Sequence, residues 1–380
     1  MRILVTGLLG QYPLGGVTWD YMQYVLGFER LGHEVYYFED TGQWPYQPNE
    51  RGLGADPSYT VDYLARLMRR FGLEDRWAYC YPWQSQWFGL DAARRREVID
   101  GAELTINVSG TLARPERYRG RGRLVYLDSD PVFTQVKLAR GQDDFRRLVD
   151  AHDVCLSFGE CMGAEVPQTG HVWLATRQPI VLSEWEPVAA RRDVWTTVLT
   201  WASYNPVEFE GVVYGQKDVE LARFEDLPRL AAPSRFELAV SRGKRTKLPD
   251  DLLRHKGWGL VDPAEVSADI DAYRDYVRTS FGEWSVAKNG YVRGQSGWFS
   301  CRSACYLAAA RPVVVQETGF SKVLPVGDGL LSFRSVEQAV DCVRRVAADW
   351  EHHSLAARAL AEQFFDSDRV LTELIEAATG

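Results

Sequence analysis

Two carboxylates separated by one residue are the first groups of this chain that could do chemistry. Asp128-Ser129-Asp130 directly follows Arg123–Leu127, which has the pattern of a buried strand. Carboxylates at a strand end could chelate Mg²⁺, because hard cations take oxygen ligands. Asp130 could instead cap the next segment or face a substrate, where it could act as a general base. We favour this second interpretation and predict no metal site.

A second group of residues has the chemistry of a phosphate site. The glycine turn Thr318-Gly319-Phe320 follows Val313-Val314-Val315, a run that is apolar on both faces like a parallel strand. In open α/β sheets ligands bind beyond the carboxyl ends of strands, where glycines let backbone N–H groups approach an anion. Fixed cations and backbone donors stabilise an anion. The side chains that we predict to join this turn are Lys217, Lys288, Arg302 and Ser303.

The N-terminal loop offers further glycines to a ligand. Gly15 and Gly16 stand between the apolar run Arg2–Thr6 and the amphipathic stretch Val17–Leu31, so they could approach a phosphate or a second substrate. The loop begins like the TGxxGxxG motif of short-chain dehydrogenases. However, Pro13 replaces the third glycine and the chain has no Tyr-x-x-x-Lys pair, which argues against a nicotinamide enzyme.

Among the six histidines, His171 is the best candidate for a substrate contact. It lies near a predicted interdomain hinge at 176–192, and Trp173 is close by in the sequence. Histidine is the side chain that most often transfers protons near neutral pH. We therefore count it with Asp130 as a candidate catalytic residue.

Strand-like and helix-like runs alternate along the chain and predict an α/β protein with two Rossmann-like open sheets facing each other across a cleft. We expect an N-terminal domain at 1–185, a second domain at 186–360, and a C-terminal helix at 361–380 that packs back on the first domain. Residues 40–58 and 75–90 lack periodicity and are expected to form long loops. The strands that we predict are Arg2–Thr6, Glu34–Phe38, Leu104–Val108, Arg123–Leu127, Val154–Phe158, Trp195–Trp201, Phe236–Val240, Gly259–Val261 and Val313–Val315.

Composition narrows the class of partner. The 380 residues are 46% hydrophobic, and a net charge of −8 argues against nucleic acid as the main partner, because phosphate backbones need a concentrated basic face. Six cysteines without a CxxC pair suggest a reduced compartment. No apolar run is long enough to span a membrane. We expect a cytoplasmic protein without a tightly bound cofactor, in which oligomers are possible.

The segment around the glycine turn resembles the donor-binding half of GT-B glycosyltransferases, in particular the group 1, family 4-like enzymes. The match lies in Tyr306-Leu307-Ala308, Arg311 and Pro312-Val313-Val314, followed by Thr318-Gly319-Phe320. The glutamate pair of many retaining members is absent, since Cys305 and Gly297 occupy those positions. The resemblance implies a nucleotide-sugar donor on the second domain and an acceptor on the first.

The same resemblance implies a bacterial hexosyltransferase that transfers a sugar, for example from a UDP-sugar, to a small molecule, a natural product or a glycan. Glu283-Trp284-Ser285 resembles the Glu-Gly-Phe-Gly loop of related transferases, which would place Glu283 on the donor sugar. Loop tryptophans, including Trp44 and Trp83, could stack on sugar faces. The alternatives are a sugar-nucleotide epimerase of the same fold and a non-catalytic sugar-nucleotide-binding homologue.

Overall fold

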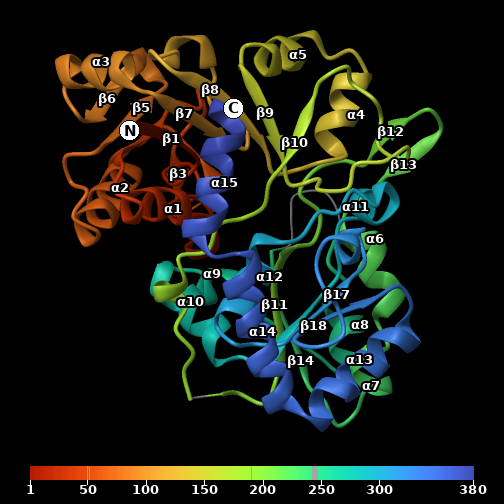
Figure 1. The fold of residues 1–380 in the computed structure, drawn as a ribbon. Coiled ribbons are helices and arrows are strands. Elements are labelled where there is room, and N and C mark those ends of the chain that lie inside the picture. The colour runs from red at the N-terminus through yellow and green to blue at the C-terminus, as the bar shows by residue number, and fades with distance from the viewer. Residues whose placement is uncertain (49, 51, 190, 242–246) are drawn as a thin grey trace.

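The computed structural model describes all residues except 49, 51, 190 and 242–246, and it confirms an α/β fold built on two sheets (Figure 1). The first sheet has the strand order β10-β9-β8-β7-β1-β2-β5-β6. All of its pairings are parallel except that of β5 with β6. Its strands are β1 (Arg2–Thr6), β2 (Glu34–Glu39), β5 (Trp77–Tyr81), β6 (Gln86–Gly89), β7 (Leu104–Val108), β8 (Arg123–Asp128), β9 (Val154–Ser157) and β10 (Trp173–Ala175).

The second sheet is parallel throughout and has the order β15-β14-β11-β16-β17-β18. Strand β17 is buried along its whole length, as its unbroken apolar sequence predicts for a strand covered on both faces. The strands are β11 (Trp195–Thr200), β14 (Phe236–Ser241), β15 (Trp258–Val261), β16 (Gly282–Ser285), β17 (Val313–Gln316) and β18 (Leu330–Phe333).

Helices cover the two sheets. Two short hairpins form separate two-stranded sheets. Around the first sheet lie α1 (Gly15–Arg30), α2 (Ser58–Arg70), α3 (Ala92–Gly101), α4 (Phe133–Ala139) and α5 (Asp143–Asp150). The later helices are α6 (Lys217–Leu221), α7 (Leu227–Leu230), α8 (Asp250–His255), α9 (Pro263–Val266), α10 (Ile270–Thr279), α11 (Asn289–Gly294), α12 (Cys301–Ala308), α13 (Val336–Ala348), α14 (Trp350–Phe364) and α15 (Ser367–Thr379). The hairpins pair β3 (Tyr46–Gln47) with β4 (Gly52–Leu53) and β12 (Val207–Phe209) with β13 (Val212–Tyr214).

An apolar core crosses from one domain to the other. Trp19 of α1 packs against Trp185, and Trp185 packs against Tyr273 of α10, with ring centroids 5.3 and 6.3 Å apart. The indole N–H of Trp19 also donates to the Ile270 carbonyl at 2.9 Å. These contacts hold α1 against the second domain, so the N-terminal end of this helix lies at the domain junction.

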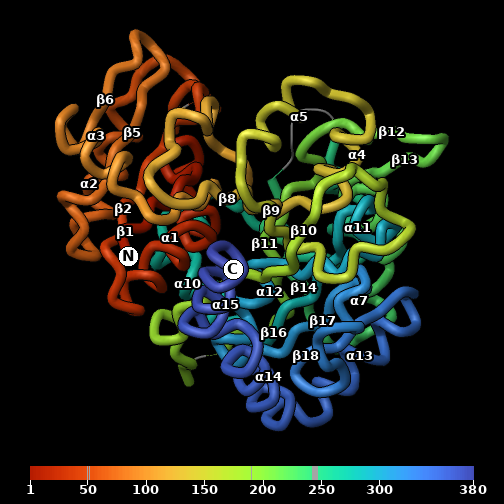
Figure 2. The backbone as a smooth tube through the Cα atoms, turned by 45° about the horizontal axis from the view of Figure 1, so that its top comes forward, coloured from red at the N-terminus to blue at the C-terminus, as the bar shows by residue number. Residues whose placement is uncertain are grey.

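The chain ends on the first domain. Helix α15 lies beside α1, as both views show (Figures 1 and 2), and Leu371 fills the space next to Gly27. The preceding helix α14 runs from Trp350 to Phe364, so position 361 falls inside a helix that packs on α12 of the second domain.

The structure corrects the prediction of a long loop at 75–90. Trp77–Tyr81 forms strand β5, which is buried throughout and pairs with β2 on one side and β6 on the other. Its sequence, Trp-Ala-Tyr-Cys-Tyr, has no alternation because both faces are covered. Part of the segment 40–58 likewise forms the small β3–β4 hairpin and the start of α2.

Candidate functional site

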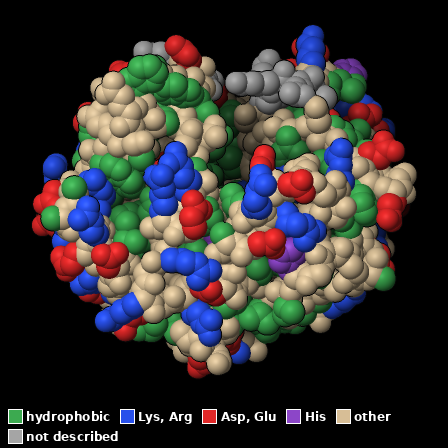
Figure 3. All heavy atoms as spheres, turned by 90° about the horizontal axis from the view of Figure 1, so that it is seen from above, with side chains coloured by type: hydrophobic (Ala, Val, Ile, Leu, Met, Phe, Trp, Pro, Cys, Tyr) green, Lys and Arg blue, Asp and Glu red, His purple; other side chains and the backbone are tan. Residues whose placement is uncertain are grey.

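The carboxyl ends of the parallel strands of both sheets meet at the domain junction. Asp130, two residues after β8, pairs with Lys288, three residues after β16, at 2.9 Å. The backbone N–H of Cys161, which follows β9, donates to the Ser296 carbonyl at 2.8 Å. Viewed from above, the surface is hollowed between two lobes, with hydrophobic side chains along the hollow (Figure 3). Ligands of open α/β sheets bind at such strand ends.

Three cations predicted from the sequence come together at this junction. Lys217 begins α6, Lys288 precedes α11 and Arg302 lies in the first turn of α12. Burial, and then the charges of Arg302 and Lys288, hold the pKa of Lys217 well below its usual range. Within the described part of the chain, the Lys217 ammonium has no hydrogen-bond or ion-pair partner, so it is the cation most available to an anion.

A small pocket lies beyond the carboxyl ends of β16 and β17. Arg302, Ser303, Thr318 and Phe320 line it together with Ser285 and residues of the loop before α12. The Ser303 hydroxyl is buried and lacks a hydrogen-bond partner among the described residues. The first backbone N–H groups of α12 also point out of the helix at this end, where the helix dipole favours an anion. The pocket therefore has several unused donors for an anionic ligand.

The turn Thr318-Gly319-Phe320 uses one of its backbone donors to bind the neighbouring acid Glu317. Gly319 has a φ of +98°, and a Cβ there would lie 2.4 Å from the Gln295 carbonyl oxygen, so both the turn and the packing require glycine. Its backbone N–H donates to Glu317 Oε1 at 2.6 Å, and the Thr318 hydroxyl donates to the Trp298 carbonyl. Thr318 and Phe320 thus shape the pocket, while the Gly319 amide is already occupied.

Glu283 lies in strand β16 rather than in a loop, which corrects the sequence interpretation of Glu283-Trp284-Ser285. Its side chain is fully buried and accepts from Arg302 Nε at 2.5 Å. Arg302 also donates to the Val198 carbonyl at 2.7 Å and to Ser285 Oγ at 2.9 Å. The carboxylate therefore fixes the arginine that lines the pocket.

The two acids at the carboxyl end of β8 have different partners. Asp128 is buried and accepts from Thr134, Gln135 and Ser157 at 2.7–3.0 Å, so it organises the start of α4. Burial raises the pKa of Asp128, and these bonds oppose that shift. Asp130 instead pairs with Lys288 of the second domain. Among the described residues, no group of three or more His, Cys, Asp or Glu side chains could hold a metal ion.

Asp130 is held by three donors from the second domain. Lys288 Nζ and the hydroxyls of Tyr204 and Tyr291 all donate to its carboxylate, the Tyr204 bond being 2.8 Å long. Burial alone would raise the pKa of Asp130, but Lys288 and the two tyrosines hold it below its usual value. A carboxylate stabilised in this way is a weak base.

Gly15 and Gly16 lie at the same junction but face protein. The Gly15 N–H donates to the Ser267 carbonyl and the Gly16 N–H donates to Ser267 Oγ, at 2.9 and 3.2 Å. A Cβ on Gly15 would lie 2.1 Å from the Asp269 carbonyl oxygen. These glycines let α1 approach α10 closely, and their amides are engaged.

His171 lies apart from the other candidates. It precedes β10, and its Nε2 contacts Asp150 of α5, which precedes β9, at 2.8 Å. Because β9 and β10 are parallel, these residues stand at the amino ends of the strands, on the opposite edge from Asp130 and Lys288.

Two acids that the sequence did not single out as site residues lie near the junction. Burial raises the pKa of Asp20 on α1 to about 7, against the opposing charge of Arg302. Its carboxylate has no hydrogen-bond or ion-pair partner among the described residues. Glu39, at the end of β2, accepts from the N–H groups of Gly10 and Gln11, both at 2.8 Å, and so shapes the loop after β1. In the sequence, Asp20 cannot be distinguished from an acid that stabilises the start of a helix.

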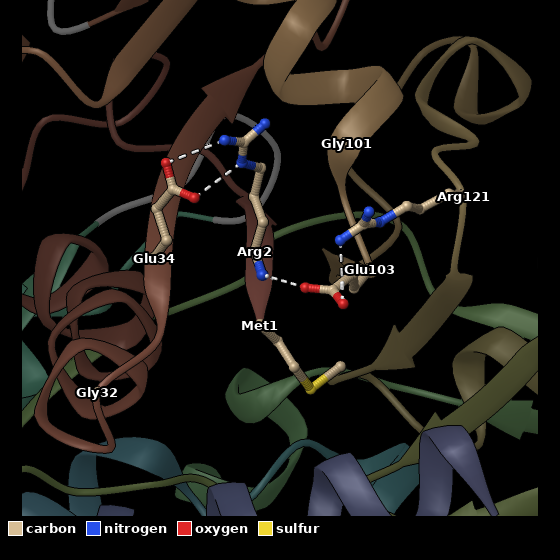
Figure 4. Close-up of a pocket in the computed structure, with 7 residues that line it drawn as sticks. All are labelled: Met1, Arg2, Gly32, Glu34, Gly101, Glu103 and Arg121. Atoms are coloured by element: carbon tan, nitrogen blue, oxygen red, sulfur yellow. Dashed lines mark hydrogen bonds and ion pairs between the residues drawn. The ribbon is translucent and has the colours of Figure 1, made fainter.

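A larger cavity of about 380 Å³ lies elsewhere. Figure 4 shows it between Arg2, Glu34, Glu103 and Arg121, at the amino ends of β1, β2 and β7. Its charged groups pair with one another, for example Arg2 with Glu34 at 2.9 Å. We therefore place the functional site at the smaller pocket, where strand ends, unpaired donors and cations coincide.

Across the described residues, none of the helices has the length and apolar character that crossing a membrane requires. On the face shown in Figure 3, Lys and Arg side chains are interspersed with Asp and Glu. That face carries no broad basic surface.

No protein-family model and no curated protein matches this chain. Solved structures do match along almost all of it. Anabaena Alr3699/HepE in complex with UDP-glucose has a TM-score of 0.60 at 10% identity, covering 99% of this chain and 98% of that one. AviGT4, a glycosyltransferase involved in avilamycin A biosynthesis, has a TM-score of 0.55 at 12% identity, covering 98% and 96%.

A third match is an alpha-glucosyltransferase in complex with UDP and a 13-mer DNA, with a TM-score of 0.55 at 11% identity and complete coverage of both chains. At such low identities, these structural similarities show the fold alone. The chain has the GT-B fold, as the resemblance of its donor-like segment implied.

Proposed function

We propose that this protein is a glycosyltransferase that moves a sugar from a nucleotide-sugar donor to an acceptor held by the first domain. One observation carries the proposal. Arg302 and the unpaired Ser303 hydroxyl line a pocket at the carboxyl ends of β16 and β17, and Lys217 is close enough to Arg302 for the two charges to interact. The GT-B neighbours solved in complex with UDP or UDP-glucose support a donor of this class.

The donor diphosphate would lie between Lys217, Arg302 and the N-terminus of α12. These groups neutralise the charge that develops on the leaving nucleotide when the glycosidic bond to the sugar breaks. Glu283 keeps the Arg302 guanidinium in place before the donor arrives. No tightly bound cofactor is needed for this chemistry, and we expect none.

The pocket volume is about 20 Å³, much less than the several hundred Å³ of a ligand site. Donor entry therefore requires the domains to separate, and closure afterwards would exclude water from the reactive donor. The Asp130–Lys288 pair is one of the contacts that must break. Lys288 would then be free to join the phosphate.

On the acceptor side, Asp20 is better suited than Asp130 to take a proton. Its carboxylate is half-buried and unpaired within the described structure, and its pKa of about 7 suits a general base near neutral pH. This role applies if the sugar is transferred with inversion. We propose a small-molecule, natural-product or glycan acceptor in a bacterial cytoplasm, and we propose no catalytic role for His171.

The two alternatives predict different products. An epimerase would change the sugar nucleotide without an acceptor, and a non-catalytic homologue would bind it unchanged. A thermal-shift panel of UDP-, dTDP- and GDP-sugars identifies the donor, because a ligand bound only by the native state raises apparent stability. Incubation of that donor with an acceptor library, followed by mass spectrometry, should yield glycosylated product. A donor that is bound but never transferred would contradict the proposal.

A further inference from the structure

Two tryptophans are exposed on loops at the cleft edge of the first domain. Trp83 is 60% exposed and Trp44 is 40% exposed, although most of the large aromatic side chains are buried. Trp44 follows β2 and Trp83 follows β5, and these two strands are parallel neighbours. Both loops therefore leave the sheet at the edge that faces the second domain.

The two indoles form one platform. Their ring centroids lie 6.3 Å apart with the planes inclined by 28°. Tyr81, which is buried, supports Trp44 from the side with its ring 5.9 Å away. The Tyr81 hydroxyl in turn donates to the Ala55 carbonyl. Tyr81 thus holds Trp44 in place, while both indoles remain partly exposed to water.

The backbone beside Trp83 is strained. Gln84 and Ser85 have φ values of +56° and +51°, in the left-handed region that residues other than glycine rarely adopt. Such strain persists where the surrounding structure enforces it, and it concentrates at binding sites. The exposed side chains of Gln84, Ser85 and Gln86 also place amide and hydroxyl groups next to the indole.

Exposed indole rings beside neutral polar side chains fit a carbohydrate ligand better than another class of ligand. The C–H face of a sugar ring packs on an indole, while its hydroxyls need neutral hydrogen-bond partners at the rim. Exposed apolar patches rimmed by polar groups mark ligand sites. Strand β5 is four strands from β8 in the sheet, about 20 Å at the usual strand spacing. A molecule that contacts both the platform and the junction must contain several rings.

We propose that Trp44 and Trp83 form an acceptor subsite for a sugar ring remote from the reacting hydroxyl, so that the acceptor is an oligosaccharide or carries one. The proposal rests on the proposed function and names the class of its acceptor. It explains why two large apolar side chains stay exposed on this edge.

The test is binding of the labelled protein, in the presence of UDP, to an array of mono- and oligosaccharides. The wild type should retain at least one class of oligosaccharide. Trp83→Ala should bind that class at least about tenfold more weakly, and Trp83→Phe should keep most of the affinity because the ring face remains. Leu355→Ala, at an exposed position of α14, is the matched surface control and should match the wild type.

Calorimetry with UDP separates this proposal from the proposed function. All four proteins should bind UDP equally, which also shows that the variants fold. Failure of the wild type to bind any of UDP, dTDP and GDP would contradict the proposed function and leave glycan binding as a separate result. A wild type that binds no oligosaccharide, or a Trp83→Ala variant that binds as well as wild type, would overturn the subsite. Altered self-association of Trp83→Ala with unchanged glycan binding would identify a protein interface instead.

Discussion

Lys288 Nζ lies 2.9 Å from Asp130 Oδ1, and this ion pair joins the second domain to the first. The ammonium also lies over the rings of Phe133, Tyr204 and Tyr291, at 4.8–5.2 Å from their centroids. An aromatic cage and a carboxylate thus hold a cation that a donor phosphate would need. If the proposed function is right, Asp130 competes with the donor phosphate for Lys288.

Replacing Asp130 by Asn should loosen the junction and favour the donor. The free energy of unfolding should fall by about 1–3 kcal/mol, because Lys288 and the two tyrosine hydroxyls lose a charged acceptor. UDP should bind more tightly, because the diphosphate no longer competes with Asp130 for Lys288. Urea unfolding and calorimetry measure the two effects.

Asp144→Asn is the control for that change. Asp144 pairs with Arg147 on the surface of α5, with 96% of its side chain exposed, and such pairs contribute little. Its stability and UDP affinity should match the wild type. Weaker UDP binding by Asp130→Asn would mean that Asp130 supports donor binding and does not oppose it.

Arg302 should tolerate neither loss of its partner nor replacement by lysine. An ammonium cannot satisfy Glu283, the Val198 carbonyl and Ser285 together, so Arg302→Lys should cost about 2–4 kcal/mol of stability and weaken UDP binding. Glu283→Gln should cost a similar amount by leaving the buried guanidinium without its counter-charge. Arg94→Lys, at a position 37% exposed on α3, should change stability by less than about 1 kcal/mol.

The double variant Glu283→Gln/Arg302→Met measures how strongly the stabilities contributed by Glu283 and Arg302 depend on each other. Because neither charge then remains buried, its loss of stability should be smaller than the sum of the two single losses. Additive losses would show that the two side chains act independently.

Asp20 should make stability depend on pH. Its folded pKa of about 7 is above the ordinary value of 3.8, so between these values the folded state binds more protons than the unfolded state. Its contribution is therefore greatest at low pH and is lost as pH rises through about 7. Asp20→Asn should gain stability over wild type from pH 5 to pH 8, by at most about 1.4 kcal/mol per pH unit.

Urea unfolding of both proteins across this range gives the difference directly. Asp62→Asn, at an exposed position of α2, should follow the wild type. A difference between Asp20→Asn and wild type that does not vary with pH would exclude the raised pKa.

The same carboxylate predicts a pH profile for transfer. If Asp20 is the general base, kcat/KM should rise with pH through about 7 as it loses its proton, and Asp20→Asn should lower kcat by about 10²-fold or more. Donor affinity should stay within a few-fold of wild type. Unchanged kcat in Asp20→Asn would remove Asp20 from the mechanism.

Local signals predicted the strand and the glycine turn beside the candidate pocket, and long-range packing decided the rest. Pro312 and the valines before Gly319 are sufficient to indicate a buried strand and a turn. By contrast, Asp130 and Lys288 are 158 positions apart, and no pattern in the sequence indicates their pairing. His171 lies on the opposite edge of the sheet from Asp130, because it precedes β10. That position follows only from the parallel pairing of β10 with β9.

Glu283 shows a different limit of sequence interpretation. An acid in a short Gly-Glu-Trp-Ser segment suggests a polar loop, because burying a lone carboxylate is costly. The segment is a buried strand only because Arg302, 19 residues later, reaches back to the carboxylate. Strand β5 was missed for a related reason, since a strand covered on both faces lacks the alternation that marks a half-buried one.

The most direct test of a nucleotide-sugar site at α6 and α12 is calorimetric titration with UDP, dTDP and GDP of wild type and of Lys217→Gln. At least one of these nucleotides should bind the wild type, and Lys217→Gln should weaken it about tenfold or more, because the unpaired ammonium beside Arg302 is lost. Lys137→Gln on α4, where the lysine lies 5.2 Å from the Phe145 ring, should bind normally. Failure of the wild type to bind any of the three, or equal binding by Lys217→Gln, would contradict the site.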